Sequence, residues 1–338
     1  MTRRLIVMLL LAATVPGLAF AVGRPRAPRL VPRDVSDVPS YVRRVAPAIV
    51  ALRVRAREDA ASSARLGARR FATGVVFDPR GYALTVSYAL LDAMAIEAQI
   101  RGGRRVPARL AAIDLETGLG VVKLEDAGPW SAATLGQSSD LAVGAVTGTV
   151  GVDEDNDLAW VTSRLQGVRR FSGPWEYMLD RALIVAPSTD SWGGSAVVDA
   201  QGVVVGIASL RLGEPPHVNL AIPIEKFVAV KDELLAAGRV VSRPPRPWLG
   251  LYTVSARGGL VIDGFSPVGP AREAGFVRGD RILSVNDVTI ASQEEFYEQL
   301  WRGRAGDVVR VSIQREAAVH VIAVKSVDRY RLFPPLGR

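Results

Sequence analysis

The chain has 338 residues, of which 49% are hydrophobic and 22% charged, and its formal net charge is +8 at pH 7. This composition is that of a globular protein and excludes a disordered chain, and the length favours two domains over one. The absence of cysteine excludes disulfides, thiolate metal sites and a cysteine nucleophile. The basic residues are spread out without interleaved aromatics, which argues against nucleic acid as a partner and leaves at most weak contact with an anionic membrane surface.

Residues 1–21 have the organisation of a signal peptide. Two arginines precede an apolar run, and Ala19-Phe20-Ala21 fits a cleavage site. The alternative is a retained membrane anchor over residues 5–22, but a spanning helix needs about 20 apolar residues. We therefore expect cleavage near Ala21, a secreted or periplasmic mature chain, and an extended leader over residues 22–40 that is rich in Pro and Arg.

Short β-type runs separated by turn signals dominate residues 41–240. The first set comprises residues 48–54, 72–77, 83–86, 96–100, 106–113 and 119–124, and the second set residues 145–150, 159–163, 183–186, 196–198 and 203–208. Many short strands at regular spacing are typical of β-barrels or sandwiches, and this region is long enough for two barrels. Apolar residues at helical spacing then predict a closing helix that stops at Gly238.

Three prolines in the segment 241–247 mark a linker, because proline cannot continue a helix. A second small domain is expected over residues 248–328, with a C-terminal tail at 329–338. Its predicted strands lie near residues 251–254, 260–263, 281–285, 308–314 and 320–324. We predict a short helix over "AREAGF" and a longer one over "SQEEFYEQLW", which opens with the capping box of Ser292 and Glu295.

Both parts of the chain resemble one family, the HtrA/Deg secreted trypsin-like serine proteases with a C-terminal PDZ domain. The segments "ATGVVFDPRGYALT", "AIDLETGLGVVKLE" and "GGSAVVDAQGVVVGI" follow the order and spacing of the segments that carry the family's catalytic His, Asp and Ser. The resemblance implies a mainly β fold, a trypsin-like double β-barrel followed by a small α+β PDZ domain. It also implies peptide substrates or ligands, and a homo-oligomer as one possible assembly.

The positions equivalent to the family's catalytic triad hold none of its three residues. Tyr88 stands at the histidine position and Gly118 at the aspartate position. The nucleophile position holds Gly193 in the ungapped alignment, or Trp192 when the two glycines are aligned instead. The chain's two histidines do not fill the gap, because one, His217, lies in a loop before the last barrel strand and the other, His320, in a strand of the PDZ domain.

Two serines of the same loop, Ser191 and Ser195, leave open an unconventional site. A serine hydroxyl is a poor nucleophile without a base within hydrogen-bond reach. Lys123 and Asp190 are the available candidates, and we interpret both serines as loop-capping residues instead. Trp192 is expected to fill the cleft that would admit the scissile bond. The sequence therefore predicts a proteolytically inactive domain, with no intact catalytic residue.

The PDZ part shows no comparable loss. Residues Trp248, Leu249, Gly250 and Leu251 resemble the family's carboxylate-binding loop, whose backbone N–H groups capture the C-terminus of a peptide. The resemblance implies that the peptide adds as a strand beside residues 251–254. Phe296 and Leu300 of the following helix are expected to face this groove, with plain core packing as the alternative for Trp248 and Phe296.

The acidic run at residues 153–157 lacks the glycine and the bidentate glutamate of a calcium loop, so we interpret it as a solvated hairpin tip and expect no metal or cofactor. The resulting hypothesis is a secreted pseudoprotease that binds C-terminal or extended peptide segments as an adaptor, regulator or chaperone-like factor in protein quality control. The alternatives are an active endopeptidase with an unconventional site and a structural subunit of an active paralogue.

Overall fold

The computed structural model describes residues 38–101 and 103–333, which belong to one compact unit, Val38–Arg338. The predicted signal peptide, the leader up to residue 37 and the end of the tail lie outside the described residues. Within the described ranges, no helix is long and apolar enough to cross a membrane.

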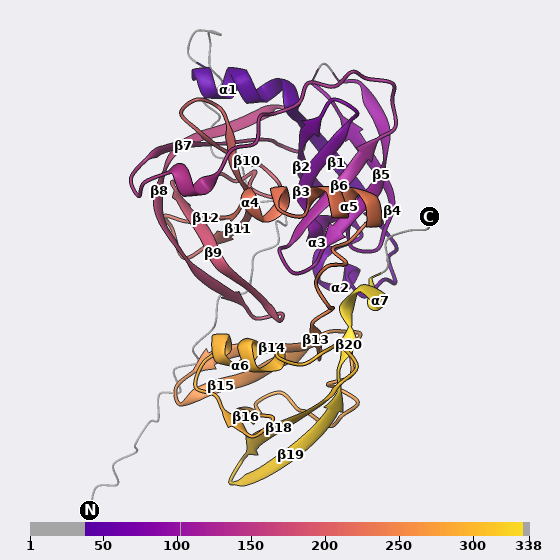
Figure 1. The fold of residues 1–338 in the computed structure, drawn as a ribbon, viewed down its shortest axis with the longest axis vertical. Coiled ribbons are helices and arrows are strands. Elements are labelled where there is room, and N and C mark those ends of the chain that lie inside the picture. The colour runs from indigo at the N-terminus through magenta and orange to yellow at the C-terminus, as the bar shows by residue number, and fades with distance from the viewer. Residues whose placement is uncertain (1–37, 102, 334–338) are drawn as a thin grey trace, which may run out of the picture. The chain divides into compact units, whose positions relative to one another are not determined.

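The first set of predicted strands forms a closed barrel with strand order β1-β2-β3-β6-β5-β4 (Figure 1). Its strands are β1 Ile49–Ala56, β2 Arg69–Asp78, β3 Tyr82–Val86, β4 Ala93–Gln99, β5 Arg105–Asp114 and β6 Leu119–Leu124. Short helices α1 Ser40–Val45, α2 Ser63–Leu66 and α3 Ser87–Leu90 precede or interrupt them. All neighbouring strands are antiparallel, and their inward side chains (Val75, Leu84 and Val121 among them) are fully buried.

The second set also closes into a barrel, with order β10-β11-β12-β9-β8-β7, which confirms the predicted double barrel (Figure 1). Its strands are β7 Val146–Val152, β8 Leu158–Gly173, β9 Tyr177–Ala186, β10 Ala196–Asp199, β11 Val204–Leu212 and β12 Val218–Pro223. The acidic run lies between β7 and β8, as the hairpin interpretation requires. The closing helix is split in two, α4 Glu225–Val228 and α5 Lys231–Ala237, and the left-handed Gly238 ends it.

Strand β8 is far longer than the predicted segment 159–163. It continues beyond a register shift between Leu165 and Gly167 and forms a hairpin with β9, in which Gly173 pairs with Tyr177. The sequence hides this extension because a glycine and two adjacent arginines, Arg169 and Arg170, interrupt the alternation of apolar and polar residues. The tip of this hairpin, residues 173–177, contacts the C-terminal part of the chain.

The C-terminal part is a sheet of order β14-β15-β16-β18-β19 with one covering helix (Figure 1). Its elements are β13 Pro247–Trp248, β14 Leu251–Ala256, β15 Gly259–Phe265, β16 Arg281–Val285, β17 Val288–Thr289, α6 Gln293–Leu300, β18 Val308–Arg315, β19 Ala318–Lys325, β20 Val327–Asp328 and α7 Arg329–Leu332. The N-cap half of the predicted capping box is confirmed, because Ser292 Oγ accepts the Glu295 N–H at 3.1 Å, while the Glu295 carboxylate accepts the N–H of Ala291 at 2.6 Å.

The helix predicted over "AREAGF" is wrong. Residues 271–275 form a series of turns, with bonds from the Ala274 N–H to the Pro270 carbonyl at 3.0 Å and from the Gly275 N–H to the Arg272 carbonyl at 3.4 Å. Gly275 has φ +95°, a left-handed conformation that ends the turn before a helix can propagate.

The start of the C-terminal tail packs back onto the first barrel. The Tyr330 hydroxyl accepts the Leu115 N–H at 3.1 Å, and Phe333 is buried in a cluster with Leu91, Ile113 and Leu115. Strand β20 before it pairs with β13, so Pro247 and Trp248, at the edge of the predicted linker, are part of a two-stranded sheet. The contacts of Tyr330 and Phe333 with the first barrel join segments that are more than 200 residues apart in sequence.

Candidate functional site

The structure brings two of the three positions that were predicted to be triad-equivalent into direct proximity. Tyr88 lies on α3, just after β3, and Gly193 lies in the loop between β9 and β10. A Cβ atom added at Gly193 would be 3.1 Å from the Tyr88 hydroxyl. In the ungapped alignment, the residue at the nucleophile position therefore faces the residue at the base position.

Tyr88 is chemically unsuited to accept a proton. Its hydroxyl donates to the Ser209 carbonyl at 2.8 Å, so the proton is already committed to a hydrogen bond. Burial raises the pKa of Tyr88 well above its ordinary value, and an interaction with the Trp192 side chain opposes this only in part. At neutral pH the phenol stays protonated and cannot act as a general base.

At the third position, Gly118, the side chain of Tyr177 fills the space that a side chain there would need. Gly118 has φ +83°, and a Cβ atom there would lie 3.0 Å from the hydroxyl of Tyr177. That hydroxyl donates to the Thr117 carbonyl at 2.7 Å, and burial raises the pKa of Tyr177. The turn therefore accepts a glycine and leaves no room for a carboxylate side chain without displacing Tyr177.

In the predicted nucleophile loop, hydrogen bonds engage the hydroxyl of Ser195 and the backbone N–H of Ser191. Ser195 is fully buried, and its hydroxyl donates to the Ser191 carbonyl and lies 3.3 Å from Thr73 Oγ1. The Ser191 N–H donates to Thr189 Oγ1 at 3.2 Å. In the described part of the chain, no hydrogen bond joins either serine hydroxyl to a histidine, lysine or carboxylate side chain.

The alternative bases lie elsewhere. His217 contacts the Gly213 carbonyl of its own loop at 2.6 Å, and His320 is exposed on β19. Lys123 donates to the Leu124 carbonyl, and Asp190 pairs with Arg211 at 2.7 Å. The Arg211 guanidinium also lies 6.0 Å from the ring of Trp192, which packs partly buried against the core of the second barrel.

The predicted carboxylate-binding loop, residues 248–251, already holds a carboxylate. Glu176, at the tip of the β8–β9 hairpin, accepts the Leu249 N–H at 3.0 Å and the Leu251 N–H at 2.8 Å. Gly250 between them has φ +82°, which turns consecutive N–H groups toward one point. The loop therefore has the geometry of an anion-binding nest, and a side chain of the same molecule occupies it.

The rest of the hairpin tip lies along β14 and α6. The Thr253 N–H donates to the Pro174 carbonyl at 2.9 Å, and the Tyr297 hydroxyl donates to the Gly173 carbonyl at 2.6 Å. The Gln293 side-chain amide donates to the Thr253 carbonyl at 2.7 Å. The hairpin thus occupies the groove in which an added peptide strand was expected.

Phe296 and Leu300 of helix α6 were expected to face the groove. Phe296 and Leu300 are buried in the core of the C-terminal sheet, at 0% and 1% exposure, because they lie on the face of α6 that packs against the sheet. From the same helix, the Gln293 side chain reaches β14 and the Tyr297 hydroxyl reaches the hairpin tip. Trp248 is 5% exposed and contacts the Phe333 ring edge-on, so the core-packing alternative describes its surroundings here. A peptide contact by any of the three stays a prediction.

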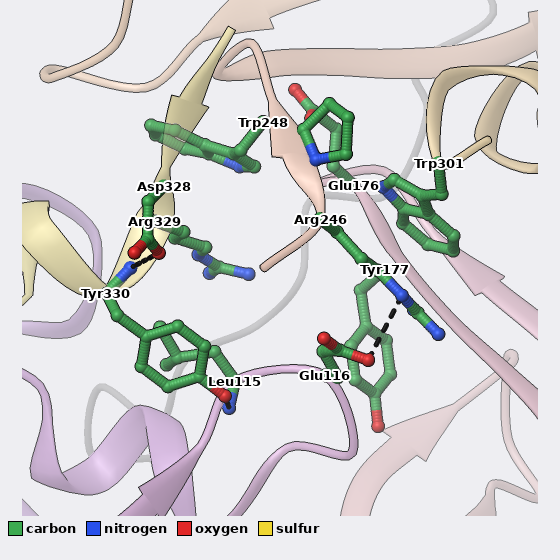
Figure 2. A pocket seen from close by; sticks show the side chains of 11 residues that line it. Leu115, Glu116, Glu176, Tyr177, Arg246, Trp248, Trp301, Asp328, Arg329 and Tyr330 are labelled. Atoms are coloured by element: carbon green, nitrogen blue, oxygen red, sulfur yellow. Dashed lines mark hydrogen bonds and ion pairs between the residues drawn. The ribbon is translucent and has the colours of Figure 1, made fainter. Parts of the chain in front are cut away.

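Sequence reasoning missed Glu176 altogether. Figure 2 shows it in one pocket with Trp248, Arg329, Glu116 and Arg246. Burial raises the pKa of Glu176 to about 7, while the loop N–H groups and the positive charge of Arg329 oppose that rise. No local signal marks this residue, since its partners lie over 70 positions further along the chain. Among the described residues, no group of His, Asp or Glu side chains could hold a metal ion.

Comparison with known families gives two matches. Residues 72–207 match the trypsin-like peptidase domain, and residues 247–325 match the PDZ domain. The first match contains Tyr88, Gly118 and Gly193, and the second contains the nest and α6.

Curated relatives span both regions. The serine endoprotease DegS of Salmonella typhimurium is 28% identical over 92% of this chain and 92% of its own length. DegS of Escherichia coli K12 is 27% identical over 81% of each chain. A probable periplasmic serine endoprotease DegP-like of Halomonas elongata is 27% identical over 77% of this chain and 57% of its own length.

Solved structures agree on the fold. The serine endoprotease from Yersinia pestis is 25% identical, with a TM-score of 0.53 over 86% of this chain and 97% of its own. The HtrA-type protease AlgW with decapeptide is 22% identical, with a TM-score of 0.52 over 85% of this chain and 97% of its own.

Proposed function

Since the chain is a homologue of the HtrA/DegS serine endoproteases, with a trypsin-like peptidase domain and a PDZ domain, we propose that it is a proteolytically inactive member of this group. Its function is to bind C-terminal or extended peptide segments through the PDZ domain. It acts as an adaptor, regulator or chaperone-like factor in protein quality control.

One observation carries the proposal of inactivity. Where the family's chemistry needs a hydroxyl nucleophile beside a base, this chain has Gly193 facing Tyr88. Tyr88 is protonated and donates its hydrogen to Ser209, so a water or hydroxyl placed there would find no proton acceptor. Without nucleophile and base, a protease retains only about 10³–10⁴-fold acceleration over water, far from useful turnover.

A fluorophosphonate probe tests this directly. We expect the wild-type chain to remain unlabelled after hours of incubation, because no serine hydroxyl is activated. Intact-mass spectrometry measures the adduct, and an active serine protease treated in parallel shows that the probe is reactive. Labelling of Ser191 or Ser195 would show that the domain is an enzyme.

The rival function is an active serine endopeptidase with an unconventional site, and the names of the relatives favour it. It predicts cleavage of unfolded casein that disappears in Ser191→Ala or Ser195→Ala. The hypothesis of an inactive domain predicts that the wild type and both variants cleave casein equally, at the background rate.

The periplasm is the proposed location, supported by the signal-like N-terminus and by the printed name of the DegP-like relative. Partners are proposed to be protein C-termini, with an active paralogue or further copies of this chain as assembly partners. Co-purification with an active protease, together with no binding to free peptides, would favour the structural-subunit alternative.

A further inference from the structure

We propose that the tip of the β8–β9 hairpin is an internal ligand of the PDZ carboxylate nest, and that a C-terminal peptide binds there by displacing the Glu176 side chain. The inference rests on the proposed peptide binding. It adds that the binding site is closed in the free protein, so that peptide capture and release of the hairpin are one event.

The first observation is the occupancy of the nest. Glu176 is 4% exposed and its carboxylate accepts two converging backbone N–H groups, those of Leu249 and Leu251. Its backbone has φ +54°, the left-handed conformation that the last residue of a three-residue hairpin loop ordinarily adopts. The turn therefore presents the Glu176 side chain to the nest.

The second observation is the register along β14. Leu251 and Thr253 are two residues apart on the strand, and they bind Glu176 and Pro174, which are two residues apart on the hairpin. This spacing and the opposite chain directions are those of an added antiparallel strand. The hairpin therefore presents a carboxylate and a strand-like carbonyl as the end of a bound peptide would.

The third observation is a bond that the internal ligand cannot make. A strand added beside Thr253 would donate an N–H to its carbonyl, but Pro174 has none. The Gln293 side chain supplies that donor instead, at 2.7 Å. A free peptide with an ordinary residue at this position can make both backbone bonds, so the internal ligand is a weaker version of the peptide it excludes.

The remaining contacts attach the hairpin to α6 along its length. The hydroxyl of Ser172 donates to Glu294 at 2.5 Å, and Arg170 pairs with Glu298 at 2.7 Å. The Arg170 and Glu298 side chains are about half exposed, where such ion pairs contribute little. The buried bonds of Glu176 and Tyr297 therefore dominate the docking, which makes Glu176 the residue to change.

The test measures the affinity of the purified full chain for a fluorescein-labelled peptide RFSGAWV with a free C-terminal carboxylate. This probe copies residues 170–176 with Pro174→Ala, which restores the missing N–H, and Glu176→Val, which leaves only the terminal carboxylate for the nest. The same peptide with a C-terminal amide is the ligand control. Fluorescence anisotropy gives the dissociation constants.

We expect Glu176→Ala to tighten binding of RFSGAWV about tenfold, because the fraction of molecules with an open nest rises. Glu214→Ala, which removes an equal charge from the exposed β11–β12 loop, is the matched control and should leave the affinity unchanged. The amidated peptide should bind weakly to all three proteins. If Glu176→Ala does not fold, the isosteric Glu176→Gln replaces it, with an expected gain of about threefold.

Two results would overturn the inference in different ways. Equal affinity of wild type and the Glu176 variant would show that the hairpin does not compete, while leaving peptide binding intact. Failure of a folded Glu176 variant to bind either peptide would refute peptide binding itself, and with it the proposed function.

The competition should also depend on pH. With its pKa at about 7 in the docked hairpin and 4.5 ordinarily, Glu176 takes up a proton on docking. Docking is therefore strongest below pH 4.5 and weakens as the pH rises through 7. We expect the ratio of dissociation constants, wild type over Glu176→Gln, to fall about tenfold between pH 5 and pH 8.

Other ionisable groups line the same pocket, namely Tyr177, Arg329, Tyr330, Asp328, Glu116 and Arg246, and the Tyr297 hydroxyl of α6 accepts the Glu176 N–H. All are present in both proteins, as is the carboxylate of the peptide, so their titration cancels in the ratio. A ratio that stays constant or rises with pH would show that Glu176 does not control the nest.

Discussion

The double variant Tyr88→His/Gly193→Ser is expected to react with a fluorophosphonate probe about 100-fold faster than either single variant, which is the scale of general-base catalysis. A Cβ at residue 193 would lie 3.1 Å from the Tyr88 hydroxyl, so the two side chains can meet. Because an imidazole is shorter than a phenol, the replacement leaves room for the serine Oγ between them. The rate of adduct formation, followed by mass spectrometry, measures the effect.

Each single variant is a control for the other. Gly193→Ser alone provides a hydroxyl but leaves Tyr88 protonated and bonded to Ser209, and Tyr88→His alone provides a base with no nucleophile. The double variant should react much more slowly than a complete triad. Gly118 has φ +83°, and the Tyr177 hydroxyl would lie 3.0 Å from a Cβ added there, so the site excludes a carboxylate that would orient the histidine. Equal labelling of Gly193→Ser and the double variant would contradict the assignment of Tyr88 to the base position.

The second large effect concerns stability: Asp114→Ala should lower the free energy of unfolding by about 2–4 kcal/mol, because it leaves buried hydrogen-bond donors without an acceptor. Asp114 is 1% exposed and pairs with Arg243 at 2.8 Å. It also accepts the Thr117 hydroxyl at 2.9 Å and the Tyr330 hydroxyl at 3.3 Å. Its removal leaves donors from the barrel, the linker and the C-terminal tail without their shared acceptor. Urea unfolding monitored by tryptophan fluorescence measures the loss.

Asp263→Ala is the matched control, since Asp263 pairs with Arg278 at 2.8 Å on the surface, with the two side chains 46% and 75% exposed. Its loss should cost less than about 1 kcal/mol. If the two variants were equally stable, the network around Asp114 would not tie the tail and the linker to the first barrel.

The sequence by itself determined the double β-barrel, the C-terminal sheet with its capped helix, and the relationship to the family. These features depend on local signals, namely alternating apolar residues, glycine turns and motif order, which a single chain displays directly. The residues at the triad-equivalent positions, by contrast, stay a prediction from the resemblance. Strand β8 was underestimated because Gly167 and two arginines conceal its continuation, and the "AREAGF" segment was mistaken for a helix because its composition outweighed the turn at Gly275.

Only the tertiary structure decided what surrounds those positions. Tyr177 beside Gly118, and Glu176 in the nest, come from one hairpin whose partners lie about 60 residues before it and 75 after it in sequence. Such pairings depend on how the two barrels pack against the C-terminal sheet, and no sequence pattern near Glu176 predicts them. The carboxylate loop was therefore predicted from its own sequence, whereas the carboxylate that fills it could be found only in three dimensions.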